Sequence, residues 1–152
     1  MAYLLDSGVL LRLIDSKDSE HSLVEDAVDG LILRQDTLLM ATQNVAELWN
    51  VATRPVANNG LGLPPLEVQS LYEEMIAPVC GVVGESEESH INFLRLLAQY
   101  SVVGKQVHDA RLVAVMLAWQ LENILTLNDR DFRRYEAEGI KIATPAQLVA
   151  KQ

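Results

Sequence analysis

The sequence predicts an α/β fold in which helices cover a parallel sheet. Two short apolar runs, residues 2–5 and 38–41, show no alternation of polar and apolar side chains, which indicates strands buried on both faces. Apolar residues at helical steps of three and four follow each run. The composition is 49% hydrophobic but only 5% aromatic, and such an aliphatic core suits helices packed on a sheet.

Length and composition limit the class of protein. A chain of 152 residues is most simply one domain, residues 1–152, and it is long enough to bury a core without disulfides. The single cysteine, Cys80, excludes an internal disulfide framework and is interpreted as a small core residue. No apolar run approaches the roughly 18 residues of a membrane span, and no basic region precedes an apolar one at the amino terminus. We therefore expect a soluble, cytoplasmic protein that does not enter a membrane.

The chain is strongly acidic. It has 12 basic and 21 acidic residues, which give a formal net charge of −9. This balance argues against a protein that holds nucleic acid through a broad basic surface. It is compatible with an enzyme that contacts a phosphate group through metal ions.

Asp6 follows the first predicted strand, at the edge where open parallel sheets bind ligands because the loops there diverge. A helix begins next, with apolar residues at positions 9, 10, 13 and 14, and Ser7 can cap it. Asp is also a preferred cap, so a purely structural role for Asp6 stays open at this point.

A second helix is predicted over residues 19–32 and a third over residues 45–54. The apolar stripe of the third helix leaves Glu47 on its opposite side, where it faces either solvent or a cleft. Asn44 and Glu47 also have the spacing of a capping box, which is a competing local role.

The middle of the chain continues the pattern of helices and strands. Residues 57–65 are rich in turn formers and predict an exposed loop. A helix over residues 66–76 and a strand over residues 79–83 follow. The acidic run at 85–88 begins another helix, since negative charge is favourable at a helix amino terminus.

Asp109 stands on the apolar stripe of a further helix, because Leu112, Val113 and Met116 follow it at steps of three, four and seven. An inward carboxylate is costly unless it caps the helix, is paired or binds a metal ion. A simple N-cap is the structural alternative.

A fourth strand is predicted over residues 121–125, with a last strand at 141–143 and a terminal helix from Pro145. The fourth strand brings four polar side chains to the same sheet edge as Asp6, unless they only form a hydrophilic turn. These side chains are Thr126, Asn128, Asp129 and Asp131.

Several acidic residues are thus predicted at one edge of one sheet, namely Asp6, Asp109, Asp129 and Asp131. Carboxylates that approach one another repel unless a cation neutralises them. Hard oxygen ligands suit Mg²⁺ or Mn²⁺, which bind phosphate oxygens and activate water. The sequence has no glycine-rich phosphate loop and no zinc-ligand spacing.

Four segments, residues 4–10, 44–55, 104–112 and 126–132, resemble the motifs of PIN-domain ribonucleases of the VapC-like toxin group. They occur in the family's order and extend over nearly the whole chain. The resemblance implies a PIN-like three-layer α/β/α sandwich with a short central parallel sheet. It also implies a Mg²⁺- or Mn²⁺-dependent endoribonuclease, the toxin of a type II toxin-antitoxin pair, with RNA as substrate and a cognate antitoxin protein as partner. A homodimer is expected as well, for which the apolar residues in 61–71 offer a surface.

The family's acidic positions can be carried over one by one. They match Asp6, Glu47, Asp109 and Asp131, which are the expected catalytic residues. The expected metal ligands are Asp6, Asp109, Asp129 and Asp131, because Asp129 can share or take the fourth place in a loop of variable length. The resemblance therefore implies that Glu47 faces the cleft.

Ser7, Thr126 and Asn128 are expected to support the carboxylates. One departure from the family pattern is Gly8, where many members carry an asparagine, and it affects a supporting hydrogen bond without removing a carboxylate.

Three other classes fit parts of the pattern. A phosphatase with an aspartate nucleophile after the first strand usually needs a second aspartate two residues later, where this chain has Gly8. A phosphoacceptor receiver domain needs its acceptor aspartate at the end of a third strand, whereas the carboxylate near that point, Glu47, is inside a predicted helix. A non-catalytic PIN-like protein that binds RNA or a protein partner would keep the same fold, and only metal-dependent cleavage separates it from the ribonuclease.

Overall fold

The computed structural model describes residues 1–151. Within these residues the strands form one parallel sheet, in which the first strand of the chain lies at the centre. The strands are β1 (Ala2–Leu5), β2 (Thr37–Ala41), β3 (Cys80–Val83), β4 (Asn123–Leu125) and β5 (Lys141–Ala143). Their order across the sheet is β3-β2-β1-β4-β5.

Helices connect the strands, and none within residues 1–151 is both long and apolar enough to cross a bilayer. A π-helical turn (Tyr72–Ile76) and 3₁₀ turns (Val56–Asn58, Gly104–Gln106 and Arg133–Glu138) complete the helical structure. The α-helices are α1 (Ser7–Ile14), α2 (His21–Leu33), α3 (Thr42–Thr53), α4 (Pro65–Leu71), α5 (Glu87–Gln99), α6 (Val107–Ala118), α7 (Asp129–Phe132) and α8 (Pro145–Val149).

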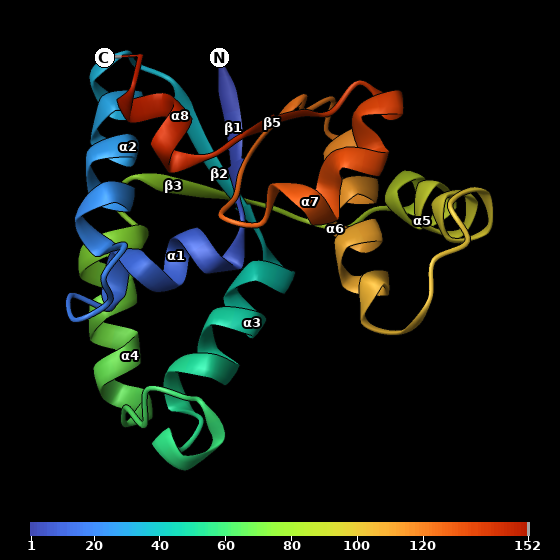
Figure 1. Cartoon of the computed structure of the whole chain (residues 1–152). Coiled ribbons are helices and arrows are strands. Elements are labelled where there is room, and N and C mark those ends of the chain that lie inside the picture. The colour runs from blue at the N-terminus through green and yellow to red at the C-terminus, as the bar shows by residue number, and fades with distance from the viewer. Residues whose placement is uncertain (152) are drawn as a thin grey trace.

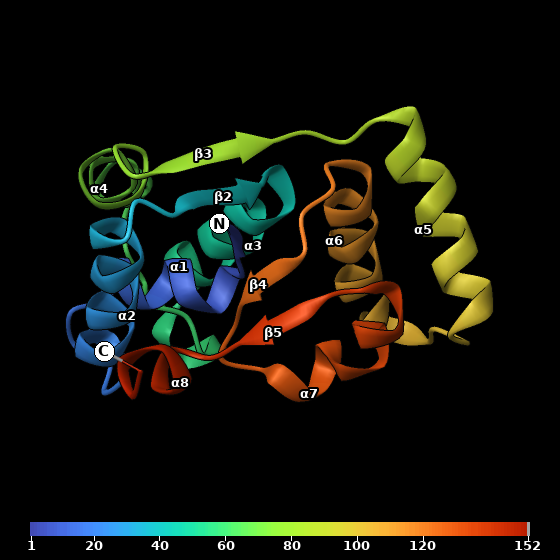
Figure 2. The ribbon, with the colours of Figure 1, turned by 90° about the horizontal axis from the view of Figure 1, so that it is seen from above.

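The helices lie in two layers, one on each face of the sheet, which confirms the three-layer α/β/α fold. Figures 1 and 2 show α1, α2 and α4 on one face and α5, α6 and α7 on the other. Side chains of β1 alternate between the two cores, because Tyr3 and Leu5 pack with α1 and α2 whereas Leu4 packs with α6. The apolar run without alternation thus reflects burial on both faces, and Cys80 is a core residue as expected.

The junction between β2 and α3 differs from the prediction. The helix begins at Thr42 rather than Val45. The buried Asn44 accepts a hydrogen bond from the backbone N–H of Ala41 (2.8 Å) and so holds the chain at this turn. The predicted Asn44–Glu47 capping box is not formed, because the Glu47 carboxylate accepts hydrogen bonds from other side chains.

The apolar residues in 61–71 pack mostly on the protein's own core. Val68 is fully buried, and Leu61, Leu63 and Leu71 are partly buried against the same cluster. Only Leu66, which is 78% exposed, projects from this set into solvent. The surface that the sequence suggests for a homodimer is therefore largely used within the chain.

Candidate active site

Asp6 lies where β1 ends and α1 begins, and it is the N-cap of α1 in place of the predicted Ser7. Its Oδ1 accepts the backbone N–H of Ser7 at 2.8 Å, and its Oδ2 accepts the hydroxyl of Thr126 at 2.7 Å. Burial raises the pKa of Asp6; the two hydrogen bonds oppose this shift and the charge of Glu47 adds to it. Capping the helix therefore also fixes a carboxylate at the carboxyl edge of the sheet.

Glu47 faces the cleft rather than solvent, so the structure decides between the two orientations that helix periodicity allows. Its Oε2 accepts the hydroxyl of Ser7 at 2.7 Å, and its Oε1 accepts the side-chain amide of Gln43 at 2.8 Å. The same amide nitrogen donates to the backbone carbonyl of His108 at 2.7 Å. One buried glutamine thus links Glu47 to the start of α6, the helix that contains Asp109.

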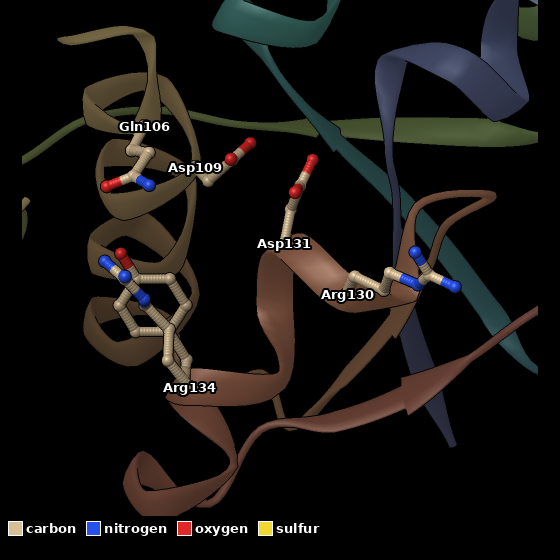
Figure 3. Close-up of a pocket in the computed structure, with 6 residues that line it drawn as sticks. Gln106, Asp109, Arg130, Asp131 and Arg134 are labelled. Atoms are coloured by element: carbon tan, nitrogen blue, oxygen red, sulfur yellow. The ribbon is translucent and has the colours of Figure 1, made fainter. Parts of the chain in front are cut away.

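Asp109 lies in the first turn of α6, after the helix has begun, and so is not its N-cap. Burial raises the pKa of Asp109 to about 7, and the negative charge of Asp131 contributes to the shift. Asp6 and Glu47 raise this pKa as well, whereas the positive charge of Arg134 lowers it. In Figure 3 the side chains of Asp109 and Asp131 point into the same space.

The loop after β4 places Asp131, rather than Asp129, at the cleft. The side-chain amide of Asn128 donates to Asp131 Oδ2 at 2.7 Å, and its backbone N–H donates to the hydroxyl of Thr126 at 3.0 Å. Asp129 instead pairs with Arg133 at 2.5 Å, which lowers the pKa of Asp129. Neither of the two cavities at this edge is lined by Asp129.

Two adjoining cavities share Asp109 and Asp131. The larger, of about 440 Å³, is also lined by Asp6, Glu47 and Arg12. The smaller, of about 90 Å³, is shown in Figure 3 and is completed by four residues of α6, α7 and the segments next to them. These four are Gln106, Arg130, Arg134 and Tyr135.

The donor set fits a hard divalent cation in charge and in chemistry. Carboxylates from four separate segments surround one cavity, and their mutual repulsion is a cost that such a cation would offset. Within residues 1–151, however, no three His, Cys, Asp or Glu side chains are gathered as ligands of a single ion. Oxygens of Asp6, Glu47 and Asp131 accept hydrogen bonds within the chain instead.

Several residues at the site are not found by the sequence reasoning. Gln43 and Arg12 have a weak signal, because each lies four residues from a cleft residue on the same helix, Glu47 and Gly8 respectively. Gln106 lies in the motif segment 104–112 but receives no role there. Arg134 and Tyr135 have no signal, since they look like ordinary surface or core positions until the fold brings them to the site.

Comparisons with known proteins agree with this architecture. A comparison with curated protein sequences finds no match. Among solved structures, the chain is similar to VapBC2 from Rickettsia felis bound to a DNA fragment from their promoter (13% identity, TM-score 0.66, 95% of this chain and 98% of that chain). It is also similar to FitAcB from Neisseria gonorrhoeae (18% identity, TM-score 0.65, 95% and 98%). A third similar structure is Mycobacterium tuberculosis VapC20, a sarcin-ricin loop cleaving toxin (12% identity, TM-score 0.62, 91% and 96%).

Identities this low indicate a shared fold and do not carry an activity from one protein to another. The family is shown by the sequence itself. The model of the PIN domain family matches residues 3–138, and this range contains every candidate carboxylate. The chain therefore belongs to the PIN domain family.

Proposed function

We propose that this protein is a Mg²⁺- or Mn²⁺-dependent endoribonuclease and the toxin component of a type II toxin-antitoxin pair. The observation that carries the proposal is the convergence of Asp6, Glu47, Asp109 and Asp131 on one cavity of a PIN-domain chain. The solved structures that the chain resembles include a toxin-antitoxin complex from Klebsiella pneumoniae and a toxin that cleaves the sarcin-ricin loop, which supports this class of function.

Asp6, Asp109 and Asp131 are the residues that would hold the cation. When bound, Mg²⁺ or Mn²⁺ supplies positive charge for the phosphate oxygens and lowers the pKa of a bound water molecule. Thr126 holds one oxygen of Asp6, and Asn128 holds one oxygen of Asp131, so both carboxylates are oriented before substrate binds.

Glu47 has a different role in this proposal. Ser7 and Gln43 fix its carboxylate at the wall of the larger cavity. From there Glu47 can accept a proton from the water molecule that attacks the phosphodiester, which is general base catalysis. The proton of the attacking water passes to Glu47 as the water oxygen bonds to phosphorus. The P–O bond to the ribose oxygen on the opposite side breaks, and that oxygen keeps the electron pair and takes a proton from solvent.

The remaining parts of the proposal concern the cell. The partners are an RNA substrate and a cognate antitoxin protein, the location is the cytoplasm, and the active form is a homodimer. A toxin-antitoxin complex from Klebsiella pneumoniae shares the fold, and this supports an antitoxin partner here.

The test is RNA cleavage with and without metal. The protein is expected to cut RNA in Mg²⁺ or Mn²⁺ and to lose activity in chelator. Asp6→Asn should fold but cleave at least about 100-fold more slowly, because an amide replaces a charged ligand of the same size. Asp29→Asn is the matched control, since Asp29 is exposed on α2 and does not line the cavities. Metal-independent cleavage, or full activity of Asp6→Asn, would refute the assignment, and no cleavage at all would favour a non-catalytic PIN-like protein.

A further inference from the structure

The carboxylates stand where two cavities meet, and arginines line both cavities. Arg12, from α1, lines the larger cavity, whereas Arg130 of α7 and Arg134, which follows α7, line the smaller one. Asp109 and Asp131 belong to both cavities. A polyanion that reaches the carboxylates therefore meets a guanidinium in each cavity, although Glu20, an ion-pair partner of Arg12, lines the larger cavity as well.

Arg12 has hydrogen-bonding capacity that the chain does not use. Its Nη1 donates to the carbonyl of Gly8 at 3.4 Å, a long contact, and its Nε is buried without a hydrogen-bond partner among the described residues. The carboxylates of Asp18 and Glu20 lie 3.6 and 3.7 Å from Nε, close enough for an ion pair but too far for a hydrogen bond. A buried donor in this state is costly unless a ligand supplies an acceptor.

The smaller cavity contains a second unmatched donor. Tyr135 is 1% exposed, and its hydroxyl has no hydrogen-bond partner within residues 1–151. Burial raises the pKa of Tyr135 and the nearby Arg134 guanidinium opposes this shift, yet the two groups do not meet the distance and angle limits of a hydrogen bond. Arg134 Nη1 instead donates to the backbone carbonyl of Tyr100 at 3.3 Å, which anchors it beside the cavity.

We propose that a single RNA strand crosses the carboxylates with one phosphate beside Arg12 and another, across the cleaved linkage, beside Arg134 and Tyr135. The two positions are called here the Arg12 subsite and the Arg134–Tyr135 subsite. This inference rests on the proposed function, because the carboxylates between the subsites are taken as the place of cleavage.

Phosphate is the chemical group that both subsites match. Its oxygens accept hydrogen bonds and carry negative charge, which suits a guanidinium with a free donor and a phenolic hydroxyl. A cavity of about 440 Å³ admits an unpaired nucleotide rather than a duplex. Arginines concentrated at the two cavities also explain how a chain with net charge −9 can hold a polyanion without a broad basic surface.

The test measures RNA binding apart from cleavage. Asp6→Asn, which is expected not to cut, is titrated in Mg²⁺ with an end-labelled single-stranded RNA oligonucleotide, and fluorescence anisotropy gives Kd at several salt concentrations. Adding Arg12→Ala or Arg134→Ala should weaken binding about tenfold. Each should also reduce the slope of log affinity against log salt by about 0.7, the loss expected for one phosphate contact on a single strand.

Arg34→Ala in the same background is the matched control. Arg34 pairs with Asp36 just before β2, at the amino edge of the sheet and away from the site, so its removal changes the net charge equally. Its Kd should stay within about twofold of the parent. If Arg34→Ala weakens RNA binding as much as the two site variants, the attraction is a general charge effect and the subsites are wrong.

Tyr135→Phe separates a ligand contact from a structural role. Because the hydroxyl has no partner in the fold, its removal should leave the melting temperature unchanged or raise it. Loss of a phosphate contact should nevertheless weaken RNA binding severalfold. RNA binding equal to that of the parent would remove Tyr135 from the subsite and overturn that part of the proposal.

Failure of the subsites and failure of the proposed function give different results. If the unmodified protein cleaves RNA in Mg²⁺ while Arg12→Ala and Arg134→Ala bind and cleave like the parent, the nuclease stands and the subsites are wrong. If the unmodified protein does not cleave RNA but needs both arginines to bind it, the subsites stand and the nuclease is wrong.

Discussion

At the scale of single residues, Asp109 bears much of the electrostatic cost of the site. It is partly buried and near the negative charges of Asp131, Asp6 and Glu47, and its pKa rises to about 7. An unfolded chain releases the same proton near pH 4. Between about pH 4 and pH 7 the folded protein therefore binds more protons than the unfolded chain, and its stability falls as the pH rises through this window.

This asymmetry predicts how the metal-free protein melts. In chelator, the melting temperature of the parent should fall between pH 5 and pH 8. The melting temperature of Asp109→Asn should fall less, because an asparagine side chain has no proton to release in this range. At pH 8 the variant should melt no lower than the parent. Adding 10 mM Mg²⁺ should raise the melting temperature of the parent by about 3–6 °C if the dissociation constant is about 1 mM. The melting temperature of the variant should rise much less. Equal metal-induced shifts in the two proteins would show that Asp109 is not part of a metal site.

A second prediction at this scale concerns Gln43, whose amide donates to both Glu47 and the His108 carbonyl. Gln43→Leu keeps the bulk but removes both bonds, so unfolding should become about 1–3 kcal/mol easier and RNA cleavage slower. Gln43→Glu should be less stable still, because a second carboxylate would face the Glu47 carboxylate and the His108 carbonyl, and neither of these can donate a hydrogen bond. Denaturant unfolding and cleavage assays on both variants test this, and Gln43→Glu with the stability of the parent would contradict the prediction.

At the scale of elements, the site is built at the carboxyl ends of neighbouring parallel strands. β1 leads directly into α1 through Asp6, and β4 leads into the loop of Thr126 and Asn128. The backbone N–H of Asp6 donates to the carbonyl of Leu125 at 3.0 Å, so sheet pairing continues to the last residue before the site. Short strands with immediate helix starts thus bring side chains from distant segments together on a rigid frame.

Gly8 provides a prediction for α1, the helix that carries both Asp6 and Arg12 at the cleft. A Cβ at position 8 would meet Arg12 Nη1 at 3.6 Å and Leu127 Cδ1 at 4.0 Å, which are ordinary contacts. Gly8→Ala should therefore stabilise the fold by up to about 1 kcal/mol, because alanine loses less backbone entropy in a helix. Thermal unfolding should show a rise of about 2–4 °C. A lower melting temperature would mean that the Arg12 side chain or the helix is displaced.

At the scale of the whole molecule, the residues that stabilise the fold and the residues of the site lie in different places. One apolar cluster packs α1 and α2 against the sheet, and the other packs α5 and α6 against its opposite face. The carboxylates lie at the edge formed by the carboxyl ends of the strands. The site therefore exposes a concentrated negative charge on an already acidic chain. This charge favours a divalent cation and repels RNA wherever arginines do not offset it.

The quaternary state is predicted at this scale as a homodimer with two-fold symmetry. Light scattering at micromolar concentration should give twice the chain mass. Since Leu66 is the exposed member of the apolar set in 61–71, Leu66→Glu should shift the protein toward monomer. Leu33→Glu is the control, because Leu33 on α2 is 84% exposed and outside this set. A monomer mass for the unmodified protein would reject the dimer.

The sequence by itself determined the layers and the edge at which the site lies. Apolar runs such as residues 2–5 specify strands buried on both faces. The residue that follows each run must then lie at the carboxyl edge of the sheet. Asp6 and Thr126 could be located in this way, and so could Asp109 from helical periodicity. These assignments are local, because a strand or helix repeat depends on residues close together in sequence.

Only the tertiary structure decided which side chains meet. Glu47 faces the cleft because Ser7 and Gln43 hold it there, and Asp131 reaches the cleft while Asp129 pairs with Arg133. The unmatched donors of Arg12 and Tyr135 become visible only when segments far apart in the chain lie against one cluster. Local periodicity fixes the face of an element, but hydrogen-bond partners and burial depend on contacts between distant segments, which no local pattern contains.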